Sequence, residues 1–259
     1  MKTVIANWKM NVGVRESVAL ARGTLLTLRG RKTIPDLVIC PPDVALSEVR
    51  KVIARSSAKL GAQNVSWEVS GSHTGETSTR MLQEFGVTHV IIGHSERRQH
   101  LGETDEMIQK KVAHVLAEQM IPILCVGETK LERDAGQAQE IIRHQLSVAL
   151  QGVRLRGGDK LFVAYEPIWA IGSGEPASVG EVVEMHRFID SVLTQLFPDA
   201  PEGQISVLYG GSVTGENAYG LLRETEVDGV LVGGASVKLN QFKDIVGAAA
   251  EVLEAQQTA

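Results

Sequence analysis

An acidic residue stands between two apolar runs in the segment 162–178, FVAYEPIWAIGSGEPAS. Four apolar or aromatic residues precede Glu166, and the apolar residues 168–171 follow shortly after it. A carboxylate among apolar groups is poorly solvated, which suits a general base that removes a proton. Gly172 and Gly174 would let the segment behind the acid fold over a ligand. The pattern therefore predicts a base with a lid attached to it.

Two other apolar runs end in polar residues that could act together with this acid. Asn7 and Lys9 follow the run TVIA, and His94 and Glu96 follow the run VIIG. A lysine can balance negative charge, and an imidazole can donate a proton to a developing oxyanion. A single lysine is usually solvated, however, and a single histidine is more often structural than catalytic. The catalytic interpretation requires the ends of these runs to meet Glu166 in the fold.

Two glycine pairs follow the last two apolar runs. Gly210 and Gly211 stand before Ser212, and Gly233 and Gly234 follow the run VLV. Glycine lets the backbone approach a ligand closely, so that amide N–H groups can bind phosphate oxygens without an arginine. Taken alone, either pair is more simply explained as a tight turn. Neither HExxH nor CxxC occurs in the chain, so we expect no metal site.

Eight short apolar runs alternate with longer amphipathic segments, and these elements must position the chemistry. The runs cover residues 3–8, 37–42, 60–65, 89–94, 121–128, 162–167, 206–211 and 229–234. Uninterrupted apolar runs are typical of parallel strands that are covered on both faces. Segment 178–198 instead has a helical period, with a capping box at Ser178 and Glu181 and a stop at Pro198.

Eight strand–helix repeats predict an α/β protein with a closed (β/α)₈ barrel, and a doubly wound open sheet is the alternative. No linker or change of composition divides the chain, so we expect a single domain over residues 1–259. In such a barrel the carboxyl ends of all strands surround one mouth, where catalytic residues lie. The barrel would therefore bring Glu166, His94, Lys9 and the glycine pairs together.

The composition argues against several classes of partner. The 259 residues carry a mild net charge of −5, and their basic residues are scattered, without the stripe that nucleic-acid binding requires. No apolar run is long enough to cross a membrane. Cys40 and Cys125 lie within apolar runs, which fits buried free thiols in a reducing compartment. We therefore expect a cytoplasmic protein that binds neither nucleic acid nor membrane.

One connection differs from the others. Segment 63–79, QNVSWEVSGSHTGETST, is polar, contains two glycines and has no helical period. A connection of this length within a compact domain is usually functional or part of an interface. We therefore expect it to contact a partner or the site.

Five motifs occur together in this chain: NWKMN, GHSERR, AYEPIWAIGSG, YGGSV and LVGGAS. In order and approximate spacing they resemble the triosephosphate isomerase family, from Asn7 to about Ser236. The glycine motifs are weak individually, whereas AYEPIWAIG and GHSERR together are highly specific. The resemblance implies a TIM barrel, the fold named after this family, and interconversion of dihydroxyacetone phosphate and D-glyceraldehyde 3-phosphate without a cofactor.

The resemblance also implies a role for each site residue. Glu166 would be the base that takes a carbon-bound proton and returns it to the neighbouring carbon. His94 would donate a hydrogen bond from a neutral imidazole to the enediolate, because the positive end of a helix disfavours imidazolium in this family. Lys9 would stabilise negative charge, Asn7 would lend a polar contact, and Glu96 would be a supporting acid near the lysine.

Two further sets of residues follow from the resemblance. Backbone amides at four positions would hold the phosphate: Gly172, Ser212, Gly233 and Gly234. The family is usually dimeric, with its long third loop inserted beside the partner's active site. Four residues match that contact here: Thr74, Gly75, Glu76 and Arg97. Glu76 and Arg97 would pair across the interface, and the alternative is an unpaired surface acid beside an arginine paired within its own chain.

Two other functions are alternatives. A different aldose–ketose isomerase for phosphorylated sugars would share the phosphate site but differ at the base and the lid. A non-catalytic phosphate-binding barrel would lack at least one of Asn7, Lys9, His94 and Glu166, and all four are present. The combination of motifs therefore favours the triose phosphate isomerase activity.

Overall fold

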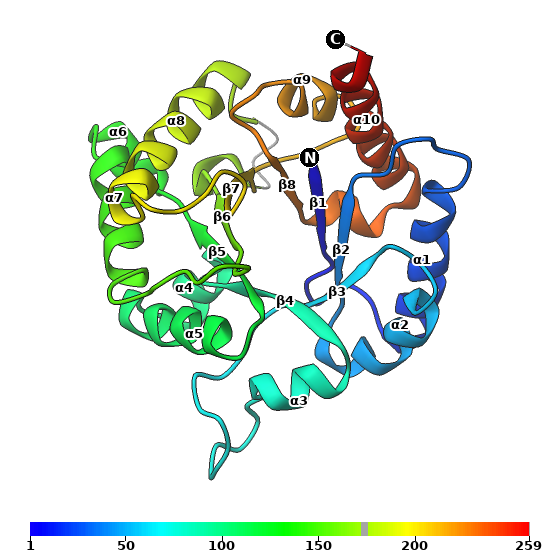
Figure 1. Cartoon of the computed structure of the whole chain (residues 1–259), viewed down its shortest axis with the longest axis horizontal. Helices are drawn as coiled ribbons and strands as arrows, with labels where there is room; N and C mark the ends of the chain where they lie inside the picture. The colour runs from blue at the N-terminus through cyan, green and yellow to red at the C-terminus, as the bar shows by residue number, and fades with distance from the viewer. Residues whose placement is uncertain (172–175, 259) are drawn as a thin grey trace.

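Eight parallel strands close into one barrel in the computed structural model, which describes residues 1–171 and 176–258 (Figure 1). The strands are β1 (Thr3–Asn7), β2 (Asp36–Cys40), β3 (Lys59–Ala62), β4 (Val87–Ile92), β5 (Ile121–Val126), β6 (Leu161–Tyr165), β7 (Ile205–Tyr209) and β8 (Gly229–Val232). β1 pairs in parallel with β2 on one side and with β8 on the other, which closes the sheet. The predicted (β/α)₈ TIM barrel is confirmed, and the alternative of an open sheet is wrong.

Helices surround the barrel (Figure 1). The α-helices are α1 (Val14–Thr27), α2 (Leu46–Ile53), α3 (Thr79–Glu84), α4 (Ser95–Leu101), α5 (Asp105–Ala117), α6 (Lys130–Asp134), α7 (Ala138–Ala149), α8 (Val179–Leu196), α9 (Ala218–Leu222) and α10 (Leu239–Thr258). The part of the chain that the structure describes also contains the short 3₁₀ helices η1 (Asp43–Ala45), η2 (Ile168–Ala170) and η3 (Gly234–Val237). Among the described residues, none of the helices combines the length and apolar character needed to cross a membrane.

The strands are buried on both faces because successive side chains point to opposite sides of the sheet. Ile5 belongs to a small cluster with residues of other strands such as Val38 and Ile91, which fills the barrel interior. Val4 and Ala6 instead belong to the larger cluster between the sheet and the helices. Both sets are apolar, which explains why the strands read as uninterrupted apolar runs.

Helix α8 begins where its capping box predicts. Ser178 Oγ accepts the backbone N–H of Glu181 at 3.3 Å, and Glu181 Oε2 accepts the backbone N–H of Ser178 at 2.8 Å. These two bonds satisfy N–H groups that the first turn of a helix leaves free. The helix ends at Leu196, two residues before Pro198. The cap lies at the far end of the segment that begins with the predicted base, Glu166, directly after β6.

The connection between β3 and α3 extends away from the barrel wall (Figure 1). It covers residues 63–78, without helix or strand, and residues 70–76 are exposed. Its return is fixed at the start of α3, where Ser78 caps the helix by accepting the N–H of Met81 at 3.4 Å. An exposed arm of this kind on a compact barrel is available for contact with another molecule.

Candidate active site

Four polar side chains meet at the carboxyl end of the barrel. Asn7 ends β1 and Lys9 follows it, His94 lies two residues beyond β4, and Glu166 directly follows β6. All four line one cavity of about 240 Å³. Closure of the barrel thus brings together residues that are far apart in the sequence, as the strand-end pattern predicts.

Two groups contact the carboxylate of Glu166, whose residue is only 2% exposed. Oε2 accepts the backbone N–H of Ser95 at 2.9 Å, and Oε1 lies 3.1 Å from Nε2 of His94. Both groups come from the N-terminal end of α4, where free N–H groups and the helix dipole favour negative charge. The carboxylate of Glu166 thus has a backbone donor at one oxygen and an imidazole nitrogen close to the other.

His94 offers its N–H from one particular ring nitrogen. Its Nδ1 caps α4 by accepting the backbone N–H of Glu96 at 3.2 Å. A nitrogen that accepts a hydrogen bond carries no proton, so the hydrogen-bond pattern assigns the proton of the neutral ring to Nε2. That nitrogen can donate to Glu166, or to a substrate oxygen that takes the place of the carboxylate.

Lys9 is held at the mouth by its backbone and by its side chain. Its φ of 51° is left-handed, which is uncommon for a residue other than glycine, and Asn7 Oδ1 accepts its N–H at 3.1 Å. Lys9 Nζ lies 2.7 Å from Glu96 Oε1. Burial by itself raises the pKa of Glu96, but the hydrogen bond and charge of Lys9 outweigh burial and lower it. Glu96 therefore stays ionised and anchors the lysine.

Backbone groups form another part of the same cavity. Ser212, Gly233 and Gly234 line it together with the four polar side chains. A Cβ at position 233 would lie 3.2 Å from Cε of Lys9, so the glycine lets the lysine pass close to the backbone. Gly234 begins η3, and the first N–H groups of a helix are free to bind an anion. Gly172, the fourth predicted phosphate residue, lies outside the described residues.

The sequence pattern of triosephosphate isomerase matches residues 2–249. The chain belongs to the triosephosphate isomerase family. Triosephosphate isomerases of Alkaliphilus metalliredigens and Aquifex aeolicus are 42% and 44% identical to it, over 95% of the chain and 98% of each relative. The crystal structure of triosephosphate isomerase from Bartonella henselae superposes with a TM-score of 0.85 at 34% identity, covering 95% of this chain and 98% of that one.

Two glycines make room for Glu166 in this member of the triosephosphate isomerase family. A Cβ at Gly127 would lie 1.8 Å from the carbonyl oxygen of Glu166, and a Cβ at Gly210 would lie 2.9 Å from Cγ of Glu166. Either contact would push the base out of place. The sequence pattern indicates only a tight turn or a close approach to a ligand at Gly210 and gives no signal at Gly127, because a glycine after a strand looks the same in either role.

A buried acid that no sequence pattern indicates, Glu128, joins β6 to the segment behind Glu166. Glu128 Oε1 accepts the hydroxyl of Tyr165 at 3.0 Å and Nε1 of Trp169 at 2.8 Å. Arg133 lies 3.4 Å from Glu128 and 4.3 Å from the centre of the Trp169 ring, and it pairs with Glu181 of the α8 cap. These residues belong to separate elements, so no spacing in the sequence marks the cluster.

The two cysteines are free and buried, as the sequence predicts. Burial, and then the nearby charge of Glu166, raise the pKa of Cys125. Its thiol therefore stays neutral and packs beside the base. Across the described part of the chain, no group of three or more His, Cys, Asp or Glu residues is placed to hold a metal ion.

A second hollow, of about 830 Å³, adjoins the site of this family member. Lys9 and His94 line it together with Gly75, Glu76 and Arg97 of the residues predicted to contact a second copy. Thr74 is exposed beside Gly75 without lining the hollow. Within the chain, Arg97 Nε donates to Glu103 Oε2 at 3.1 Å. The hollow thus connects the active-site mouth with the arm between β3 and α3.

Proposed function

We propose that this chain interconverts dihydroxyacetone phosphate and D-glyceraldehyde 3-phosphate, a step of glycolysis and gluconeogenesis, without a cofactor. The observation that carries the proposal is the contact between Glu166 and His94 inside a cavity that also contains Lys9 and glycine amides. Membership of the triosephosphate isomerase family supports it. The acid, the proton donor and an anion-binding end are the parts that this reaction needs.

Binding begins with the phosphate of the substrate. The backbone amides at Ser212, Gly233 and Gly234 bind its oxygens, and Lys9 supplies the balancing positive charge. Gly172 completes this set in our proposal. The substrate oxygen then replaces Glu166 Oε1 at Nε2 of His94, which frees the carboxylate to turn toward the adjacent carbon.

Glu166 then removes a proton from the carbon next to the carbonyl. The electron pair of the broken C–H bond forms the carbon–carbon double bond of an enediolate, and negative charge develops on the oxygen at His94. A preorganised donor aimed at such an oxygen is worth about 2.7–4 kcal/mol in transition-state stabilisation. His94 Nε2 gives its proton to that oxygen and takes the proton of the neighbouring hydroxyl, so that the negative charge moves to the other oxygen. Protonated Glu166 then returns its proton to the neighbouring carbon as the second oxygen becomes the carbonyl, which exchanges aldose and ketose.

The other site residues maintain the geometry and charge. Asn7 fixes the backbone of Lys9, and Glu96 holds its ammonium group at the mouth. An enediolate phosphate can expel its phosphate, so the site must exclude water while the intermediate exists. Ile171 lines the cavity and supplies apolar surface for this purpose.

Replacing the base tests the proposal directly. Glu166→Gln should lower kcat in a coupled triose phosphate assay by about 10²–10⁴-fold, the usual contribution of a general base. Binding of 2-phosphoglycolate, an enediolate mimic, should show that the variant is folded with its phosphate site intact. Glu140→Gln, an exposed acid on α7, is the matched control and should turn over normally.

Two outcomes would contradict the proposal. Turnover like that of the unmodified chain in Glu166→Gln would exclude the assigned base. A panel of other phosphorylated aldoses and ketoses tests the substrate, because faster turnover of any of them would assign a different isomerase activity. Binding of 2-phosphoglycolate by the unmodified chain with no turnover would instead point to a phosphate-binding protein.

We further propose that the protein is a cytoplasmic homodimer. The exposed arm that contains Thr74, Gly75 and Glu76 would enter the hollow of the partner beside its Lys9, and Glu76 would pair with Arg97 across the interface. The size of the hollow and its exposed apolar edge support this arrangement: Met10 and Leu101 line it and are 96% and 66% exposed. A stable contact would bury this apolar surface.

A further inference from the structure

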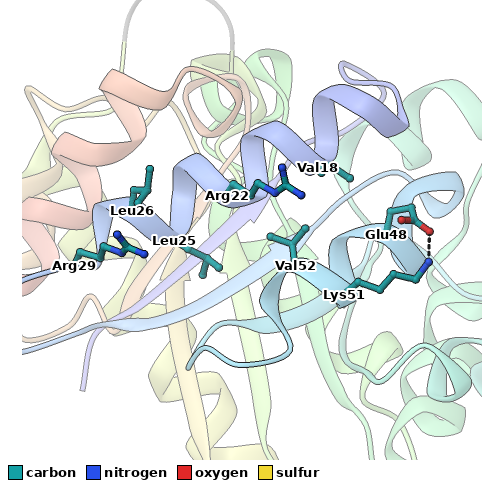
Figure 2. Close-up of a pocket in the computed structure, with 8 residues that line it drawn as sticks. All are labelled: Val18, Arg22, Leu25, Leu26, Arg29, Glu48, Lys51 and Val52. Carbon is teal, nitrogen blue, oxygen red and sulfur yellow. Dashed lines mark hydrogen bonds and ion pairs between the residues drawn. The ribbon is translucent and has the colours of Figure 1, made fainter.

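The outside of the barrel carries a groove that the proposed function does not use. It lies between α1 and α2, has a volume of about 470 Å³ and shares no lining residue with the active-site cavity (Figure 2). Leu25 of α1 and Val52 of α2 extend into the gap between the two helices (Figure 2). Leu26 lines the same groove and is 56% exposed. The groove therefore offers apolar surface that nothing in the described chain covers.

The groove is positively charged on its α1 side. Arg22 and Arg29 line it, and neither side chain has an ion pair or hydrogen bond within the described residues. On the α2 side, Glu48 and Lys51 form an ion pair, so their charges cancel (Figure 2). Segment 14–55 as a whole holds eight Arg or Lys and four Asp or Glu, although the net charge of the chain is −5. An occupant that complements this groove must therefore be acidic.

The spacing of the two arginines selects the form of that occupant. Arg22 lies within α1, and Arg29, seven residues further on, lies in the turn that follows the end of α1 at Thr27. Figure 2 shows the two side chains on either side of Leu25, and seven residues of helix, about two turns, span roughly 10 Å. Guanidinium groups so far apart do not converge on one phosphate or carboxylate. The amides of the middle turns of α1 are used within the helix and cannot add donors. A helix with two acidic residues seven positions apart matches the spacing, with apolar side chains between them.

We propose that the groove between α1 and α2 binds an acidic amphipathic helix of a partner protein. Two carboxylates of that helix pair with Arg22 and Arg29, and the apolar residues between them pack on Leu25, Leu26 and Val52. Apolar anchors with a polar rim are the usual way in which a groove between helices recognises a third one. The arrangement lies on the outer wall, so it leaves the active-site mouth free.

A designed peptide tests this surface on the full chain. The probe is a stapled, fluorescent helix of 15 residues with two glutamates seven positions apart and leucines at the third and fourth positions between them, following the two-turn spacing. The control peptide carries lysine at both glutamate positions. Fluorescence anisotropy should show saturable binding of the acidic peptide only, and binding should weaken as salt is raised.

Paired charge reversals locate the binding. Arg22→Glu with Arg29→Glu should weaken peptide binding by at least about tenfold, since two attractive pairs become repulsive. Arg15→Glu with Arg154→Glu makes the same change in net charge at exposed positions outside the groove, and should leave binding intact. Arg22→Gln with Arg29→Gln removes the charge more gently and should also weaken binding. Triose phosphate turnover and the melting temperature report that each variant is folded.

Four results would overturn the proposal. The first is equal binding of the acidic and basic peptides, and the second is unchanged binding in both groove variants. The third is complete displacement of the peptide by inorganic phosphate at matched ionic strength, which would assign a site for single anions. The fourth is self-association that the groove variants abolish, which would make a second copy of the chain the occupant.

Discussion

His94 and Glu166 depend on each other for their orientation. The imidazole has a single proton to offer on Nε2, because the backbone N–H of Glu96 occupies Nδ1. In the free site that nitrogen lies 3.1 Å from Glu166 Oε1. In the proposed reaction the same proton binds the substrate oxygen, and the carboxylate takes the proton of the substrate carbon. In the proposed mechanism, binding of the substrate therefore replaces the contact between His94 and Glu166.

Replacing the imidazole should separate binding from chemistry. His94→Gln keeps an N–H donor but loses the fixed ring direction, so we expect kcat to fall by about 10²–10³-fold, as when one oxyanion donor is removed. The change in KM should be smaller, because the phosphate contacts remain. His144→Gln, an exposed histidine on α7, is the control. An unchanged kcat in His94→Gln would contradict the role of the imidazole.

Two other histidines make the stability of the fold depend on pH. Burial lowers the pKa of His186 and of His89 to about 4. In the unfolded chain, histidine binds its proton near pH 6.5. Between pH 6.5 and 4 the unfolded chain therefore holds more protons, so the free energy of unfolding falls as the pH falls. This stabilising contribution is fully present above pH 6.5.

Removing one of these groups should flatten that dependence. His186 Nδ1 bonds the backbone carbonyl of Glu226 at 2.9 Å, and an asparagine amide can also donate there. For His186→Asn, the loss of unfolding free energy between pH 6.5 and 4 should be smaller by about 3 kcal/mol. Urea unfolding at a series of pH values measures this slope. His73→Asn, an exposed histidine, should keep the original slope, and the same slope in both variants would contradict the prediction.

At this scale, side chains with distinctive chemistry could be located from the sequence, and backbone donors could not. Glu166, His94 and Lys9 stand out because polar types follow apolar runs. The N–H of Ser95 holds the base equally closely, yet any residue type would provide it. The sequence also does not show which glycines allow two backbone segments to approach closely. Gly127 fits against Glu166 because of how two separate strands pack.

At the scale of elements, Arg133 of α6 ties together the two flanks of the segment behind the base. Its guanidinium stacks on Trp169 of η2 and pairs with Glu181 in the first turn of α8. It also lies near Glu128, which is fully buried and bonded to Tyr165 at the end of β6. One side chain thus links the strand of Glu166 to the helix that begins beyond the loop.

Truncating Arg133 should therefore affect both stability and catalysis. Removing one partner of a buried ion pair costs about 3–5 kcal/mol, and we expect the lower end because Arg133 is 26% exposed. The melting temperature of Arg133→Ala should fall by several degrees. Its kcat should also fall, by up to about a hundredfold if the base moves by 1 Å, with a smaller change in KM. Arg133→Lys should recover part of both.

A matched residue separates this effect from the loss of any stacked arginine. Arg143 of α7 lies 5.1 Å from the ring of Phe188, in a similar contact away from the mouth. Arg143→Ala should leave kcat unchanged. Equal kcat values for the two alanine variants would show that Arg133 does not position the base.

The sequence predicts elements with a strong period better than elements held by their surroundings. The eight strands and α8, with its capping box, follow directly from apolar runs and from Ser178 and Glu181. Helix α6 has five residues, none of them buried, so the sequence has no apolar stripe that predicts this helix. The helix matters because its Arg133 contacts Trp169 and Glu181. Those contacts form only once the closed barrel has brought the elements together.

At the scale of the whole molecule, closure of the barrel creates both the mouth that contains the proposed active site and the outer wall that contains the groove between α1 and α2. One interior cluster and one outer layer pack on the same eight strands, so residues 1–259 should unfold as one domain. The mouth collects strand ends into the active site, and the outer wall leaves the groove between α1 and α2. The arm between β3 and α3 contributes nothing to either core cluster at its exposed tip, residues 70–76. Its length is explained if a second copy receives it.

Charge reversal in that arm tests the dimer. Glu76→Arg would bring two arginines together if Glu76 meets Arg97 of the partner subunit, and the dimer should weaken by at least about tenfold because like charges at an interface cost several kcal/mol. Sedimentation velocity over a range of concentrations measures the association. Turnover per chain should fall with it, since the hollow that receives the arm borders Lys9 and His94. Glu84→Arg, an exposed acid on α3, makes the same charge change and should dimerise normally. Indistinguishable dimers in the two variants would exclude the pairing of Glu76 with Arg97.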